Sequence, residues 1–347
     1  MANPKPVTLK RDLSLDFLKG TSVFFMVLTH VNAWYYTHAK AWLSFFTLWG
    51  ASICYVTFVF AYGIGYGKQL KRKGELNTAL TIKRLGALLL GYYFVASWLT
   101  SIWEGGILNL KEFLQIIFFI NLPSYTEFLP TFVFFGLLLL AFQKPIQKLL
   151  KQPVMAALVG VLIYALASYL YQLPWNFPAG DVLKGLLVGL DGLNRWGILS
   201  YFPVFLWGTT WGSHFDPADQ TGKLKYLLFF AGVVGFFALI KSGYLSERWP
   251  PSIAYLLWGL SYSFGVLVLW PGIEKFKKLA QFGIYLGRNA FDYFIWHTII
   301  IISSVAFLIP YRSWSEIPVL LSLAVVLTLI AGIIPLRLRL LKYLTNL

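Results

Sequence analysis

The sequence predicts an all-α fold: a polytopic membrane helix bundle with about ten transmembrane helices and both termini in the cytoplasm. The first observation is composition, because 58% of the 347 residues are hydrophobic and 12% are charged, with a mean hydropathy of +0.67. A soluble domain carries roughly 25% charged residues, so this chain cannot build a surface that faces water. The composition excludes a soluble enzyme, a disordered linker protein and a disulfide scaffold. We expect a single transmembrane domain over residues 1–347.

The second observation is the recurrence of apolar segments of about 20 residues, the length that crosses a hydrocarbon core of ~30 Å. Two further segments, 112–121 and 181–192, are too short to cross, and we expect them to be interfacial or re-entrant. The ten candidate spans are residues 14–36, 44–67, 80–102, 127–145, 153–172, 195–213, 224–241, 251–271, 283–309 and 317–336.

The third observation is the distribution of basic residues. With the N-terminus inside, ten alternating spans place 22 of the 29 Lys and Arg residues on the cytoplasmic side. This is the positive-inside pattern of membrane proteins, and it accounts for the net charge of +15 without a nucleic-acid partner. We therefore expect no nucleic acid, contact with membrane lipids, and a multi-pass location in the plasma membrane.

The first span carries ionisable residues on one face. At 100° per residue, Asp16, Lys19 and His30 share a stripe, and the 14 residues from Asp16 to His30 correspond to about 21 Å of rise. An ionisable group at this depth is costly, so the imidazole is expected to face protein or water. A neutral imidazole can accept a proton. The alternative is a hydrogen bond that holds helices together.

The ninth span carries a second polar stripe. Asn289, Tyr293 and His297 are spaced by four residues, and His297 should lie at a depth similar to that of the first-span histidine. For His297, too, a structural hydrogen bond is an alternative to a catalytic role. Arg288 and Asp292 have the spacing of an ion pair along one helix and are expected to neutralise each other.

The loop after the second span is rich in glycine and then in basic residues. No strand precedes it, so it is not a dinucleotide-binding fingerprint. One interpretation is a topology signal that also binds lipid headgroups, worth about 1 kcal/mol per basic residue. The other is a cytoplasmic phosphate site, since Arg and Lys both bind phosphate. The candidate phosphate-binding residues are Lys71, Arg72, Lys83 and Arg84.

The other histidines give weaker signals. His38 lies just beyond the first span among aromatic residues, either as an ordinary loop residue or at the border of an outward-facing pocket. His214 is expected in a cytoplasmic loop. The sequence has no His, Cys, Asp or Glu cluster with metal-ligand spacing, so we expect no metal.

The first span has the pattern Arg11…Asp16-Phe-Leu-Lys19-Gly20…His30. It resembles the first-helix motif of the acyltransferase-three proteins, membrane enzymes that modify surface glycans, and of the bacterial relatives of heparan-α-glucosaminide N-acetyltransferase. That motif has a histidine ten residues after the glycine, as here, but an arginine where this chain has Lys19. Three more stretches resemble the second group: 58–65 with its basic loop, 249–257 and 287–297.

The resemblance implies transfer of an acyl group, expected to be acetyl, from cytoplasmic acetyl-CoA or another acyl-CoA to a sugar hydroxyl or amine at the outer face. His30 matches the catalytic histidine of the acyltransferase-three motif, whereas His38 resembles the catalytic histidine of the heparan enzyme, so the two assignments compete. The other implied catalytic residues are Asp16, Asn289 and His297. The implied donor-binding residues are Lys19, Lys71, Arg72, Lys83, Arg84 and Arg288.

In this hypothesis a histidine acts as general base, and Asn32, Tyr35 or Asn289 supplies an oxyanion donor. A covalent acyl-histidine route remains open. The hypothesis requires a passage from the Arg84 side to His30 or His38. The alternatives are a transporter or flippase of a glycan or lipid-linked sugar, and a scaffold or sensor whose histidines are reached by no cavity. A homo-oligomer is compatible with the sequence.

Overall fold

The computed structural model describes residues 11–36, 41–103, 105–106, 108–215, 222–308 and 311–345. Within these ranges the chain forms fourteen helices and no strand. The helices are α1 (Leu13–Tyr35), α2 (Ala41–Lys73), α3 (Thr78–Trp103), α4 (Leu110–Ile117), α5 (Phe128–Ala141), α6 (Gln143–Leu150), α7 (Pro153–Gln172), α8 (Gly180–Val188), α9 (Ile198–His214), α10 (Lys223–Lys241), α11 (Ile253–Ile273), α12 (Lys277–Arg288), α13 (Ala290–Phe307) and α14 (Glu316–Thr345).

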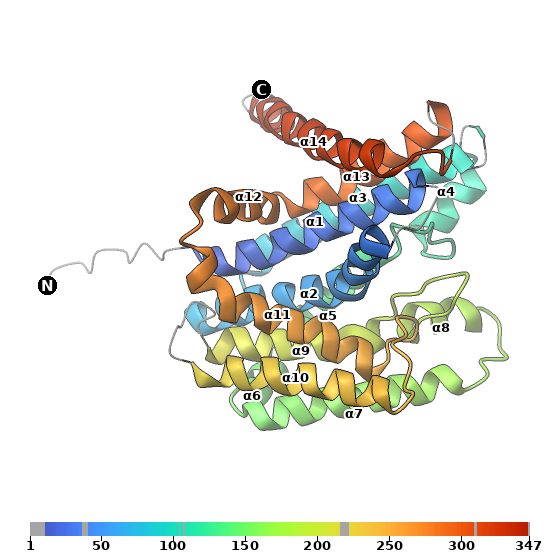
Figure 1. Cartoon of the computed structure of the whole chain (residues 1–347). Coiled ribbons are helices and arrows are strands. Elements are labelled where there is room, and N and C mark those ends of the chain that lie inside the picture. Colours follow the sequence, from blue (N-terminus) through green and yellow to red (C-terminus); the bar gives the residue numbers. More distant parts are fainter. Residues whose placement is uncertain are drawn as a thin grey trace, which may run out of the picture.

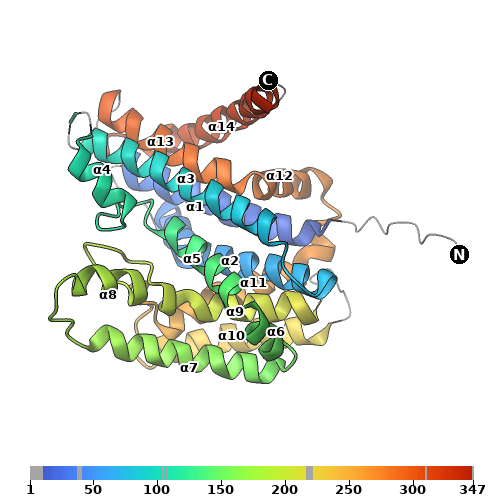
Figure 2. The ribbon, with the colours of Figure 1, turned by 180° about the vertical axis from the view of Figure 1, so that it is seen from behind.

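The long helices lie side by side, roughly parallel or antiparallel to one another (Figure 1), and the view from behind shows the same arrangement (Figure 2). One apolar core lies among α1, α3, α13 and α14, and a second among α2, α5, α9 and α11. Helices α7 and α10 turn large apolar side chains outward, including Leu162 and Val234, each 67% exposed. Such faces suit contact with lipid, and the all-α polytopic bundle that composition predicts is confirmed.

The predicted spans all coincide with helices, although the number that cross is not thereby fixed. Seven described helices are long and apolar enough to cross a membrane, or eight if the bent pair α5 and α6 forms one span. Helix α1 is not among them because it carries several polar residues, and α9 has 17 residues. The start of α1 and the end of α14 lie at the same end of the bundle (Figure 1). Ten crossings and cytoplasmic termini remain predictions.

Two predicted spans are broken in the structure. The span 127–145 bends by 85° between α5 and α6. The span predicted at 283–309 is divided at Asn289, so that α12 and α13 are separate helices. The short segments predicted at 112–121 and 181–192 overlap the helices α4 and α8, which are too short to cross a membrane.

Several helix starts follow from capping residues in the sequence. Asp12 accepts a hydrogen bond from the backbone N–H of Leu15 at 3.2 Å, which begins α1. Ser252 does the same for α11, and Asn109 with Glu112 forms a capping box at α4. Each such cap satisfies a backbone donor that the first helical turn leaves without a partner.

Glycines set the distance between α1 and α12. A Cβ atom on Gly20 would lie 1.8 Å from the carbonyl oxygen of Gly283, and one on Gly287 would lie 1.7 Å from that of Asp16. The two backbones therefore touch where larger residues would hold them apart. This crossing fixes the basic end of α1, defined as the end nearest Arg11, against the chain that leads into α13.

Candidate active site

Two histidines from distant parts of the chain meet inside the bundle. Nδ1 of His30 on α1 lies 2.7 Å from Nε2 of His297 on α13, and the two rings are nearly parallel, at 9°. His297 is fully buried, whereas His30 is partly accessible. The prediction that these residues lie at similar depth is confirmed.

The hydrogen bonds determine which nitrogen of each ring carries the proton. Nδ1 of His297 lies 2.7 Å from the carbonyl oxygen of Tyr293, and a carbonyl can only accept, so Nδ1 of His297 donates. In the neutral ring Nε2 is then an acceptor, and Nδ1 of His30 must donate to it. Neutral His30 is left with an unprotonated Nε2, which is the form of a general base.

The ring of Tyr125 also contacts His30. Its centroid lies 4.9 Å from that of His30, and the planes meet at 89°. Tyr125 has a left-handed backbone with φ of +73°, a conformation that costs a non-glycine residue about 1–2 kcal/mol. The residue with this strained backbone, in the loop between α4 and α5, is the one whose phenol ring contacts His30.

His30 opens into a cavity of about 400 Å³, here called the histidine cavity. Its wall combines aromatic, charged and hydroxyl side chains from α1, α2, the start of α5 and three loops. The lining residues are Thr29, His30, Ala33, Thr47, Leu48, Ala51, Ser124, Tyr125, Glu127, Phe128, Arg195, Trp196, Arg248 and Trp249. The structure therefore does not support the alternative of a scaffold or sensor, which requires that no cavity reaches the histidines.

A second, narrower pocket of about 80 Å³ leads from His30 to Phe58 and Phe128, and is here called the connecting pocket. A third cavity of about 160 Å³ starts at Lys19 and ends at the same two phenylalanines; this is the lysine cavity. The sequence hypothesis requires a passage to His30 from the basic end. The structure has two cavities that approach each other, with Phe58 and Phe128 between them.

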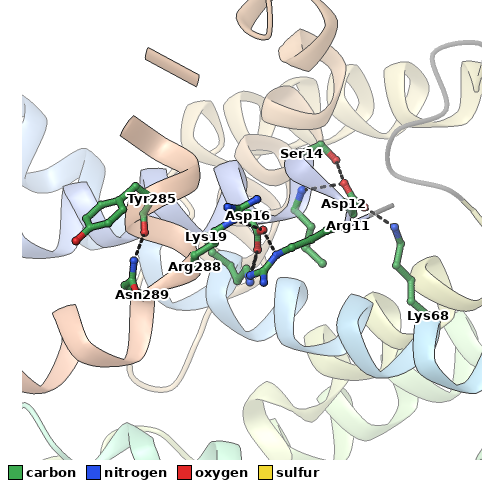
Figure 3. A network of polar contacts seen from close by, with 10 residues as sticks. Arg11, Asp12, Ser14, Asp16, Lys19, Lys68, Tyr285, Arg288 and Asn289 are labelled. Atoms are coloured by element: carbon green, nitrogen blue, oxygen red, sulfur yellow. Dashed lines mark hydrogen bonds and ion pairs between the residues drawn. The ribbon is translucent and has the colours of Figure 1, made fainter. Parts of the chain in front are cut away.

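At the basic end, three cations surround one carboxylate (Figure 3). Asp16 is 4% exposed and lies 2.5 Å from Nε of Arg11, 2.9 Å from Nζ of Lys19 and 3.5 Å from Nε of Arg288. The network keeps an excess of positive charge around Lys19, which lines the lysine cavity. Asp16 is thus a partner of Lys19 and Arg288, about four helical turns from His30.

The predicted pairing of Arg288 with Asp292 is wrong. Asp292 lies 2.5 Å from Nη1 of Arg337 on α14, while Arg288 pairs with Asp16. The break at Asn289 places Arg288 and Asp292 on separate helices, so the spacing that would bring them together on one continuous helix no longer applies.

The other predicted donor-binding residues do not join this network. Lys71 lies beside the carbonyl of His214, at 3.4 Å, in a separate cavity of about 420 Å³. Arg72, Lys83 and Arg84 are exposed at the same end of the bundle. The structure gathers Lys19 and Arg288 around Asp16 but does not unite all six candidates in one site.

The predicted oxyanion donors all have partners within the protein. Nδ2 of Asn32 donates to Oγ1 of Thr47 at 2.6 Å, and Nδ2 of Asn289 donates to the carbonyl of Tyr285 at 2.8 Å. The hydroxyl of Tyr35 bonds that of Ser304. His38 lies outside the described residues. Within the described ranges, no group of three or more His, Cys, Asp or Glu side chains could hold a metal ion.

Sequence reasoning did not select the charged residues that line the histidine cavity. Glu127 is 4% exposed, and burial raises the pKa of its carboxyl group to about 7. Its Oε2 accepts from the backbone N–H of Arg195 at 3.3 Å. The Arg195 guanidinium in turn lowers the pKa of Asp191, through a hydrogen bond of 2.7 Å. These residues come from loops, where no helical periodicity indicates a shared site.

An apolar helix bundle with contacting histidines inside, opened by a cavity, defines a polytopic membrane protein with an internal reaction or binding site. A family model described as an acyltransferase domain matches residues 12–336, nearly the whole chain. The chain therefore belongs to the acyltransferase-three family and is a membrane acyltransferase, as the motif resemblance implies. No curated protein and no solved structure matches the chain significantly.

Proposed function

We propose that this acyltransferase moves an acyl group, in the first instance acetyl, from cytoplasmic acyl-CoA to a sugar hydroxyl or amine at the opposite face, with His30 as general base. The observation that carries the proposal is the hydrogen-bond chain from Tyr293 through His297 to His30. It leaves Nε2 of His30 without a proton, and His30 lines the histidine cavity.

The proposed reaction is a direct transfer of the acyl group from the thioester to the acceptor, with His30 as general base. Nε2 of His30 removes the proton of the acceptor hydroxyl or amine as its oxygen or nitrogen attacks the thioester carbonyl carbon. The carbon–sulfur bond breaks, the sulfur leaves as a thiolate, and the imidazolium returns its proton to give free CoA. Proton transfer of this kind typically contributes ~10²–10⁴-fold to the rate.

His297 is a positioning residue in this scheme. It does not touch the substrate, because it is fully buried and both its ring nitrogens are within hydrogen-bond reach of protein atoms. By accepting from Nδ1 of His30 it favours the reactive tautomer, and as the ring gains a proton the same contact keeps the imidazolium in place.

The donor is proposed to enter from the basic end. Phosphate groups would be attracted to the positive excess around Asp16 and to the exposed Arg84 and Lys83. The thin pantetheine arm would follow the lysine cavity to Phe58 and Phe128, and movement of these side chains would admit the thioester to the connecting pocket. The acceptor would occupy the histidine cavity from the other side.

The test is transfer from labelled acetyl-CoA in membranes that contain the full chain. His30→Gln should lose at least about 100-fold in rate, the lower end of general-base contributions, with an unchanged unfolding temperature. Full activity of His30→Gln together with its loss in His38→Ala would assign the base to His38 and refute our assignment. Full activity of both variants would refute a histidine base at the first helix.

A further inference from the structure

Loop residues build part of the wall of the histidine cavity. Arg248 and Trp249 precede α11, and Arg195 and Trp196 precede α9. The guanidinium carbon of Arg248 lies 4.2 Å from the centre of the Trp249 ring, and that of Arg195 lies 4.9 Å from it. One indole therefore holds two cations at the edge of the cavity.

These two arginines differ in how their charges are balanced. Arg195 pairs with Asp191. Arg248 has no carboxylate within ion-pair distance among the described residues, and its guanidinium contact with the protein is a long one, 3.5 Å from Nη1 to the carbonyl of Ala51. A half-buried cation without a counter-charge is costly unless an anion accompanies it. Arg248 lines both the histidine cavity and the connecting pocket.

A second polar group in this wall also lacks a partner. Nε1 of Trp249 is buried and has no hydrogen-bond acceptor within reach in the described chain. Buried polar groups in proteins are satisfied in the great majority of cases. Trp249 lines the histidine cavity, and a ligand acceptor that reached this nitrogen would satisfy it. The Glu127 carboxyl can bond a hydroxyl group from the same wall.

The remaining surface suits a sugar ring. Trp196 and Trp249 pack edge to face, at 88° with centroids 5.4 Å apart, and they line the cavity together with Phe128, so the wall offers apolar aromatic surface beside its charged groups. A volume of about 400 Å³ is near the lower end of ligand pockets. This space fits a small sugar unit with its hydroxyls toward Trp249 and Glu127.

We propose that the histidine cavity selects an acceptor sugar that carries an anionic group, a carboxylate or a phosphate, and that Arg248 binds this anion. The proposal rests on the assignment of this cavity as the acceptor side of the acyl transfer. It adds a specificity-determining residue, Arg248, and a charge class for the acceptor.

Binding is tested on the full chain in detergent micelles by saturation-transfer NMR, without any acyl donor. The probes are methyl β-glucuronide, glucose 6-phosphate and the neutral methyl β-glucoside. At least one charged sugar should bind about tenfold more tightly than the neutral one, and the better of the two identifies the anion. Arg248→Gln should bring that ratio to about one. Lys184→Gln, which removes a charge on α8 outside the cavity, should leave it unchanged.

Three results would overturn the proposal. They are equal binding of charged and neutral sugars to the unaltered protein, a preference that survives Arg248→Gln, and absence of sugar binding. A kinetic result would also overturn it: a large loss of acyl-CoA hydrolysis in Arg248→Gln with sugar binding intact, which would assign Arg248 to the thioester oxygen instead. Arg248-dependent binding without any acyl transfer would refute the proposed function and leave only the binding of an anionic sugar by Arg248. Acyl transfer to neutral sugars alone would support the proposed function and refute the inference that the acceptor is anionic.

Discussion

Replacement of His297 separates the two histidine roles. The hydrogen bond from Nδ1 of His30 to Nε2 of His297 is 2.7 Å long, and such a bond is worth a net ~0.5–1.5 kcal/mol. Since 1.4 kcal/mol corresponds to a factor of ten, His297→Leu should lower kcat roughly 2- to 12-fold by letting the unreactive tautomer of His30 compete. Loss of the base itself should cost ~10²–10⁴-fold, so His30→Gln is the much slower enzyme.

Two polar replacements make this prediction specific. His297→Gln places an amide oxygen at the level of Nε2, where it can accept from His30, and should restore kcat to within about twofold of the unaltered protein. His297→Asn reaches the carbonyl of Tyr293 but not His30, and should resemble His297→Leu. The assay is kcat and KM for labelled acetyl-CoA, with the unfolding temperature as a control for folding. Equal losses in the Gln and Asn variants, or full activity of His297→Leu, would refute the tautomer argument.

Three other perturbations have defined outcomes. Gly20→Ala should lower the unfolding temperature by the equivalent of ~1–3 kcal/mol, because its Cβ atom would lie 1.8 Å from the carbonyl oxygen of Gly283. The control is Gly65→Ala, whose Cβ atom would have no neighbouring atom within 4 Å and which should be neutral or slightly stabilising. Equal effects of the two substitutions would contradict the packing argument. Between pH 4.5 and about 7, Glu127 keeps a proton in the folded protein that it releases in the unfolded chain, so the stability of the fold decreases as the pH rises through this window. Glu127→Gln removes this pH dependence. Its unfolding temperature should exceed that of the unaltered protein by a margin that grows to the equivalent of ~3 kcal/mol above pH 7. A margin that does not change between pH 4.5 and 8 would count against this. Phe58→Ala should raise acyl-CoA hydrolysis without acceptor several-fold, read as free thiol, while Phe230→Ala on the exposed face of α10 should not; an unchanged rate would show that Phe58 does not close the donor path.

Much of the helical architecture could be predicted from the sequence, because apolar length and basic loops follow from the bilayer alone. The meeting of His30 and His297 was also within reach, since equal depth follows from helical rise. The break at Asn289 was not, because the apolar pattern continues across it and a helix end depends on what α12 packs against. The pairing of Arg288 with Asp16 follows from that break.

The acceptor side of the site was beyond the sequence for a different physical reason. Glu127, Arg195 and Arg248 come from loops far apart in the chain, and loop residues have no periodicity that relates them. From the sequence, Arg248 is only one of the few basic residues predicted on the side opposite the cytoplasm. Its place over Trp249, and the lack of a counter-charge for it among the residues that the structure describes, emerge only when the loops are folded together.

The central claim, that His30 receives a thioester from one face and an acceptor from the other, is tested most directly by vectorial transfer. The full chain is reconstituted into sealed vesicles of known orientation, with labelled acetyl-CoA on the side of the basic end and an acceptor sugar on the other side. The account predicts labelled sugar only in this arrangement, and none when donor and acceptor are exchanged. Transfer with both substrates confined to one side would contradict it.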